Sequence, residues 1–227
     1  LVDQAELIDV RRDLGIVDAF QRLHDVVGPA RDLVRRDRAA RAPGPGCIVY
    51  RRAPRGLAGE SAKVLVFGDP QVKSDDDVDY FRRDIVQPLQ GRHDASLGLT
   101  LRDLVDDVPA LLPAVKQLTE SLGVPWLHAP GNHDVDPGAS SDEASLHLFQ
   151  QRIGPDTFAR QTALANIVVL DDVIYRPGQK PAYIGGFSED QFAFLERWLP
   201  TLPRDRLLVL AMDIPLFEDA VKDRFPD

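Results

Sequence analysis

The residues best suited to chemistry form one short segment, Ala129-Pro130-Gly131-Asn132-His133-Asp134, directly after the apolar run Val124-Pro125-Trp126-Leu127. An amide, an imidazole and a carboxylate occupy consecutive positions there. Amide and carboxylate oxygens bind hard cations, and an imidazole beside a carboxylate can transfer a proton near neutral pH. The segment therefore points to metal binding, to proton transfer or to both, depending on which other side chains join it.

Further carboxylates follow other apolar runs, each of which has the length of a buried strand. These carboxylates belong to Asp69, Asp103, Asp171 and Asp213. A single Asp at the end of a strand is usually a cap or a turn former. Because ligands of α/β folds bind outside the carboxyl ends of the strands, a series of such residues that includes Asn132-His133 predicts a divalent metal site.

The elements that must position these residues alternate along the chain from Val64 onwards. Buried strands are expected at residues 64–67, 97–101, 124–127, 167–170 and 207–210. Helices are expected around residues 78–85, ended by Pro88, then at 111–122 and at 192–199, the last after a capping box at Ser188 and Gln191. This alternation predicts an α/β architecture in which helices cover central sheets.

The front of the chain carries no chemical motif. Leu7, Val10 and Leu14 begin a series with helical spacing that continues to residue 24, and residues 42–46 form a Pro/Gly linker. We therefore expect a helical N-terminal extension over residues 1–46, with a role in packing. The main domain should occupy residues 47–227 and begin with a short strand at 47–50.

Composition narrows the function further. The formal net charge of −9 argues against a grip on nucleic acid, which needs a basic face. No apolar run reaches the roughly 18–20 residues of a membrane span, so we expect a soluble protein. The composition does not decide its compartment or its oligomeric state. The single cysteine, Cys47, excludes an intrachain disulfide.

Three motifs together resemble the calcineurin-like metallophosphoesterases: Gly68-Asp69-Pro70-Gln71, Thr100 to Val105, and Gly131-Asn132-His133-Asp134. The third is the most specific of them. The family's order is Asp-x-His, Gly-Asp, Gly-Asn-His-Asp/Glu, a lone His after a strand, and Gly-His-x-His. The resemblance covers about residues 64–227 and implies a four-layer αββα sandwich with two divalent metal ions, of Mn, Fe, Zn or Mg, at the strand ends.

The resemblance also implies a role for each residue that matches the motifs. Asp69 would hold the first metal, Asp103 would bridge both, and Asn132 would bind the second. His133 would contact the phosphate and protonate the leaving oxygen, oriented by Asp134. The substrate would be a small phosphate mono- or diester, hydrolysed by a metal-activated water.

The sequence departs from the family pattern at four places. Gln71 replaces a His and remains a neutral oxygen donor, and Asp213 stands where the lone His ligand belongs. Arg102 replaces the Gly before the bridging Asp, where it would repel metal or occupy a metal position by pairing with Asp69 and Asp103. The Gly-His-x-His motif does not occur before Asp227, so it is either absent or lies beyond that residue. The neighbouring carboxylates Asp106 and Asp107 are expected to be solvated.

Three functions follow from these observations. The first is a metal-dependent phosphoesterase with metal ligands Asp69, Gln71, Asp103, Asn132 and Asp213 and with catalytic residues His133 and Asp134. The second is a degenerate member of the same fold that serves as a non-catalytic binding or scaffold module. The third is a partner-binding or oligomer-forming chain that uses its N-terminal segment.

Overall fold

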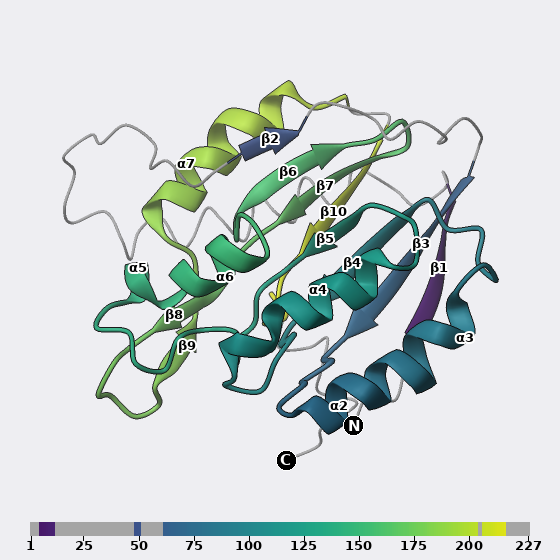
Figure 1. Cartoon of the computed structure of the whole chain (residues 1–227). Helices are drawn as coiled ribbons and strands as arrows, with labels where there is room; N and C mark the ends of the chain where they lie inside the picture. Colours follow the sequence, from purple (N-terminus) through teal and green to yellow (C-terminus); the bar gives the residue numbers. More distant parts are fainter. Residues whose placement is uncertain (1–4, 12–47, 51–60, 204–205, 217–227) are drawn as a thin grey trace, which may run out of the picture.

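The computed structural model describes residues 5–11, 48–50, 61–203 and 206–216. These residues form a mixed α/β structure with two four-stranded sheets and a separate two-stranded ribbon (Figure 1). The predicted α/β class is therefore confirmed. The linker predicted at residues 42–46 lies outside the described residues.

The first sheet has the strand order β1-β3-β4-β5. Its strands are β1 (Ala5–Arg11), β3 (Ser61–Gly68), β4 (Leu97–Leu101) and β5 (Trp126–His128). β3, β4 and β5 are parallel, whereas β1 is antiparallel to β3 and forms the edge. The three parallel strands are the ones predicted to carry the first three motifs.

The helix predicted from Leu7 is wrong over residues 5–11. This segment is a strand that pairs with β3 along its whole length, from Ala5 opposite Phe67 to Arg11 opposite Ser61. The open edge of β3 offers unpaired N–H and C=O groups, and an added strand satisfies them. Tertiary pairing therefore overrides the helical spacing. The remainder of the predicted helix, residues 12–24, lies outside the described residues.

The second sheet has the strand order β10-β7-β6-β2. Its strands are β2 (Ile48–Tyr50), β6 (Phe158–Gln161), β7 (Ala165–Val169) and β10 (Leu207–Ala211). β10 and β7 are parallel, and β6 and β7 form an antiparallel pair. β6 was not predicted, because Arg160 and Gln161 interrupt the apolar pattern. The short ribbon consists of β8 (Val173–Tyr175) and β9 (Tyr183–Gly185).

Helical segments connect the strands. They are α2 (Asp75–Tyr80), a π-helical turn (Phe81–Val86), α3 (Gln87–Leu89), a 3₁₀ turn (Pro109–Leu111), α4 (Leu112–Glu120), α5 (Asp142–Ser145), α6 (His147–Arg152), α7 (Glu189–Trp198) and a 3₁₀ turn (Leu199–Thr201). The predicted capping box of α7 is confirmed, since Ser188 and Gln191 exchange both hydrogen bonds. Pro88 does not end the first helix, because the wider π turn before it relieves the clash that proline makes in a regular helix.

Alternation along the strands divides the apolar residues into three buried clusters. Leu65 and Phe67 of β3 pack under α4 and the α2–α3 segment, whereas Val64 and Val66 face the second sheet. In the second sheet Ile167 and Val169 of β7 face inward, and residues of the opposite face pack against α7. α4 and the α2–α3 segment therefore pack on the first sheet, and α7 packs on the second.

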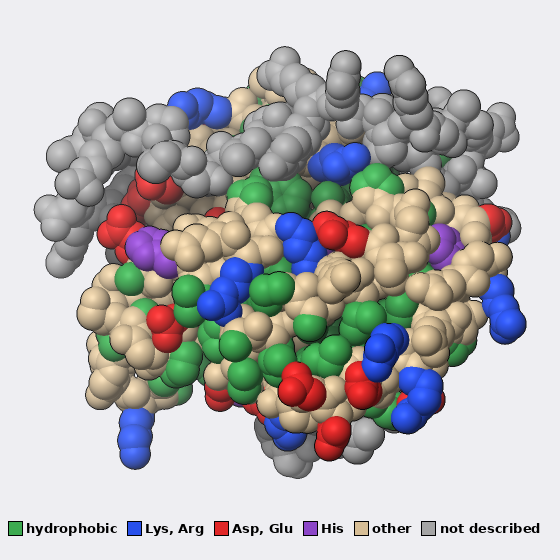
Figure 2. All heavy atoms as spheres, viewed as in Figure 1, with side chains coloured by type: hydrophobic (Ala, Val, Ile, Leu, Met, Phe, Trp, Pro, Cys, Tyr) green, Lys and Arg blue, Asp and Glu red, His purple; other side chains and the backbone are tan. Residues whose placement is uncertain are grey.

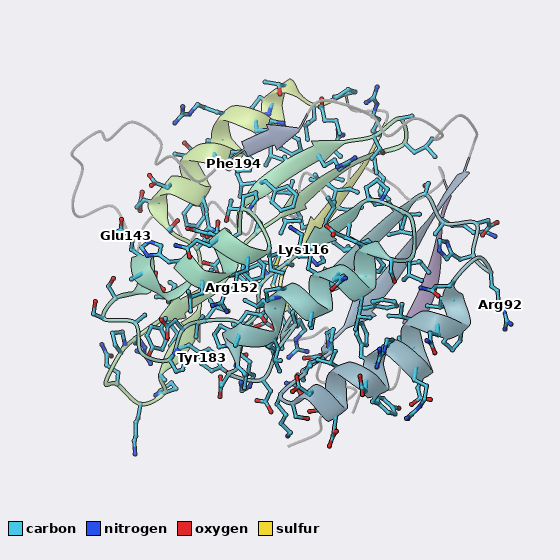
Figure 3. The ribbon with its side chains drawn as sticks, viewed as in Figure 1. Arg92, Lys116, Glu143, Arg152, Tyr183 and Phe194 are labelled. Carbon is cyan, nitrogen blue, oxygen red and sulfur yellow. The ribbon has the colours of Figure 1, made fainter. Side chains whose placement is uncertain are left out.

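Two long cations join α4 and α6 on the outside of the first sheet. Lys116 Nζ donates to the carbonyl of Ile153 over 2.9 Å, and Arg152 donates to the carbonyl of Pro109 (Figure 3). On the face that carries these helices, Figure 2 shows positive and negative side chains interspersed with apolar ones. Within the described part of the chain, no helix combines the length and apolar character that a membrane crossing requires.

Candidate active site at the strand ends

The carboxyl ends of β3, β4 and β5 lie side by side, because parallel pairing sets Gly68 opposite Leu101 and Thr100 opposite His128. Pairing continues beyond the strands. The backbone N–H of Asp69 donates to the carbonyl of Leu101 over 3.1 Å, and the backbone N–H of Gln71 donates to the carbonyl of Asp103 over 2.9 Å. The predicted ligands Asp69, Gln71 and Asp103 are therefore brought together by the backbone.

Asp103 and the loop after β5 approach each other closely at Gly131. A Cβ atom on Gly131 would lie 2.2 Å from Asp103 Oδ1 and 2.4 Å from its amide nitrogen, so glycine is required there. The amide of His133 donates to the same Oδ1 over 2.9 Å. Gln71 Nε2 donates to Oδ2 over 3.3 Å. The carboxylate of Asp103 thus joins three of the predicted site segments.

Backbone strain concentrates in these loops. In the described part of the chain, the non-glycine residues with positive φ are Asp69 (52°), Gln71 (43°), Arg102 (68°) and Asp107 (58°). A left-handed conformation costs an L-residue roughly 1–2 kcal/mol. Strained residues persist where the surroundings fix them, and they cluster at functional sites. Their grouping at these strand ends therefore supports this edge of the sheets as the candidate functional site.

Arg102 lies between carboxylates of the two sheets. Its Nε atom is 2.7 Å from Asp213 Oδ1, and one terminal nitrogen is 3.4 Å from Asp69 Oδ2. Arg102 was expected either to repel metal or to pair with Asp69 and Asp103, and the structure shows pairing. Its partners are Asp69 and Asp213, so one of the two expected carboxylates is a different one. The two residues that depart from the family pattern after β4 and β10 thus contact each other directly.

The second sheet positions Asp213. Its amide donates to Asp172 Oδ1 over 3.0 Å, and the amide of Ile214 donates to Asp172 Oδ2 over 2.8 Å. Asp213 Oδ2 in turn accepts a hydrogen bond from the backbone N–H of Asn132 over 3.2 Å. The side chain of Asp213 is only 1% exposed. No role was predicted for Asp172, because a carboxylate that anchors a neighbouring loop has no spacing signature.

His133 is paired with carboxylates other than the predicted one. Its Nδ1 atom lies 3.0 Å from Asp107 Oδ1 and 3.4 Å from Asp106 Oδ1. Both carboxylates are partly exposed, as expected of loop residues, with side chains 30% and 56% exposed, but they also contact the imidazole. Asp107 reaches His133 because its left-handed backbone turns the chain and its amide donates to the carbonyl of His133 over 3.2 Å.

Asp134 does not orient His133, which corrects the role that the resemblance implied. It is fully buried and accepts three backbone N–H bonds, from Leu104 at 3.1 Å, Val105 at 3.0 Å and Gly131 at 2.9 Å. The carboxylate therefore ties the loop after β5 to the loop after β4. It supports the site without facing it.

The electrostatics of the site follow from burial and crowding of carboxylates. Burial raises the pKa of Asp213, and the charge of Asp103 raises it further, while Arg102 opposes the shift. Burial raises the pKa of Asp172 to about 7. Burial lowers the pKa of His133, but the hydrogen bond to Asp107 and the charges of Asp103 and Asp107 outweigh it, so the net pKa is raised.

The predicted ligands fit a dinuclear metal centre only in part. Asp69, Gln71, Asp103 and Asn132 come from adjoining loops, but the Asp213 carboxylate is already hydrogen-bonded to a guanidinium. Three carboxylates and one guanidinium leave a formal charge of about −2, which one divalent cation would neutralise. Among the described residues, Asp69, Asp103 and Asp213 do not bring three ligand atoms within 4.8 Å of one another, so the fit to a dinuclear centre is only partial.

A second group of possible ligands lies beside the first. Among the described residues, Asp106, Asp107 and His133 can each bring one ligand atom within 4.8 Å of the others. Lys73 Nζ already lies 3.4 Å from Asp106 Oδ2. Exposed acidic groups commonly lie this close without a metal ion. We therefore interpret Asp106 and Asp107 as carboxylates that surround the His133 imidazole and not as a metal site.

Neither the models of known protein families nor the curated proteins contain a match to this chain.

Proposed function

We propose that this chain is a metal-dependent phosphoesterase of the calcineurin-like type that hydrolyses small phosphate mono- or diesters. The observation that carries the proposal is the convergence of Asp69, Gln71, Asp103, Asn132 and His133 at one edge of the sheets, through hydrogen bonds of both backbone and side chains. The order of layers, with two facing sheets between helices, supports an αββα sandwich of that type.

The oxygen donors would hold the divalent metal. Asp69 and Asp103 supply carboxylates, and Gln71 and Asn132 supply amide oxygens. Bound there, the cation would supply Lewis-acid polarisation of the phosphoryl group and a nucleophile at neutral pH. The left-handed backbone at Asp69 and Gln71 fixes the direction of these side chains before any ligand binds.

His133 is suited to donate the proton that the leaving oxygen requires. Its Nδ1 atom is engaged by Asp107, which leaves Nε2 for a substrate, and its side chain is 32% exposed. The nearby carboxylates raise its pKa and so favour the imidazolium, the form that can donate a proton. Asp107, in place of Asp134, orients the ring in this proposal.

The test is hydrolysis of p-nitrophenyl phosphate and bis-p-nitrophenyl phosphate with Mn²⁺, Mg²⁺, Zn²⁺ or Fe²⁺ and with a chelator. We expect metal-dependent turnover, and we expect His133→Ala to lower kcat by about 10²–10⁴-fold, the range of general acid catalysis. His147→Ala, at an exposed histidine of α6, serves as the matched control and should keep full activity. Absence of hydrolysis with all four metals, or an unchanged His133→Ala rate, would contradict the proposal.

The ion pair between Arg102 and Asp213 favours a second candidate, a non-catalytic binding or scaffold module on the same fold. The double variant Arg102→Gly with Asp213→His restores the family pattern at both positions. A scaffold that has lost the rest of its chemistry should remain inert after this change. Recovered turnover would instead argue that a working site was altered at these two positions.

A further inference from the structure

Arg102 places a positive charge among the carboxylates of the candidate site. The inference drawn from this charge rests on the proposed function. The guanidinium lies where two strand-end loops of the first sheet meet the loop after β10, and it contacts one carboxylate from each side. A cation that bridges carboxylates of different loops performs the structural task of a metal ion.

The burial of Asp213 shows why a cation is needed at that position. The side chain is 1% exposed, and a carboxylate buried to this extent requires a charge partner or a proton. Its Oδ2 atom accepts one backbone N–H, and its Oδ1 atom accepts the Arg102 Nε–H. Arg102 therefore supplies the charge that a metal ion would otherwise supply to this carboxylate.

The backbone indicates that this arrangement is held against strain. Arg102 has a φ of 68°, a conformation that glycine adopts freely and that other L-residues avoid. Arg102 keeps this conformation because hydrogen bonds fix the backbone on either side of it. One of these bonds runs from the backbone N–H of Asp69 to the carbonyl of Leu101. Substitution by glycine therefore removes the guanidinium and relieves the backbone strain at residue 102.

We propose that the Arg102 guanidinium occupies one of the two cation positions of the predicted dinuclear centre, so that the site takes at most one divalent cation. The ligands left for that cation are Asp69, Gln71, Asp103 and Asn132. Asp213, held by Arg102, becomes available as a ligand only when the guanidinium is removed.

The experiment measures the number of Mn²⁺ ions bound per chain, by equilibrium dialysis with metal analysis, for the full chain and three variants. The unmodified protein should bind no more than one ion at this site. Arg102→Gly should bind one ion more than the unmodified protein. Arg102→Lys should leave the number unchanged because it keeps a cation. Arg102→Gly with Asp213→Asn should lose the additional ion because a ligand is removed.

Two ions at the site of the unmodified protein would overturn the inference, and so would an unchanged number in a folded Arg102→Gly. Circular dichroism and the urea midpoint establish whether each variant is folded. If Arg102→Gly does not fold, the count for the unmodified protein decides alone. Metal stoichiometry does not depend on turnover, so this inference can fail while the proposed hydrolysis holds. Hydrolysis can likewise fail while the count stands.

Discussion

The fully buried carboxylate of Asp134 offers the sharpest test of how the site is built. It accepts the amide protons of Leu104, Val105 and Gly131, so Asp134→Ala would leave three buried N–H groups without a partner. Each orphaned donor costs roughly 1–3 kcal/mol. After partial relaxation of the loop we expect a loss of about 3–6 kcal/mol, a large share of the 5–15 kcal/mol typical of a domain.

Asp134→Asn should cost less and separate the individual bonds. One amide oxygen can still accept the two N–H groups, from Leu104 and Gly131, that now share Oδ2. The amide NH₂ group would face the Val105 amide, which loses its acceptor. We therefore expect a loss of about 1–3 kcal/mol for Asp134→Asn, the cost of one unsatisfied donor.

Urea unfolding followed by circular dichroism measures both losses. Asp136→Ala is the matched control in the same loop, because Asp136 makes a single local bond to the amide of Gly138 and should cost about 0.5–1.5 kcal/mol. The refuting result is an Asp134→Ala protein within about 0.5 kcal/mol of the parent in stability but with a lowered His133 pKa by NMR. That outcome would restore the role of Asp134 as the partner of His133.

Two further predictions concern the surroundings of His133 and Asp103. Asp107→Asn keeps a residue that tolerates the left-handed backbone and removes the carboxylate that raises the His133 pKa. The NMR titration of His133, and the loss of general-acid activity as pH rises, should both move to lower pH, and an unmoved titration would contradict the pairing. Gly131→Ala should destabilise the fold by about 1–3 kcal/mol, because its Cβ would overlap Asp103, and should weaken Mn²⁺ binding. Gly68→Ala, whose Cβ meets nothing within 4 Å, is its control, and equal urea midpoints for both would refute the steric argument.

Some expectations from sequence failed where local pattern and tertiary structure competed. Residues 5–11 have helical spacing, yet they form an edge strand because β3 offers a row of unpaired backbone groups. Asp134 follows His133 directly, but consecutive side chains in a tight turn point in different directions. The nearest carboxylate in sequence was therefore the wrong partner, and Asp107, 26 residues away, is the one in contact.

The sequence by itself determined the α/β class, the five apolar strands from Val64 onwards and the residues that follow them, because buried strands are short apolar runs and turns need particular residues. It also singled out Asp69, Asp103, Asn132, His133 and Asp213 from their place after those runs. Only the tertiary structure decided which charges neutralise one another. Ion pairing depends on distances between segments that are remote in sequence, as in the 2.7 Å contact of Arg102 with Asp213, 111 residues along the chain. Spacing along the chain carries no information about such a distance.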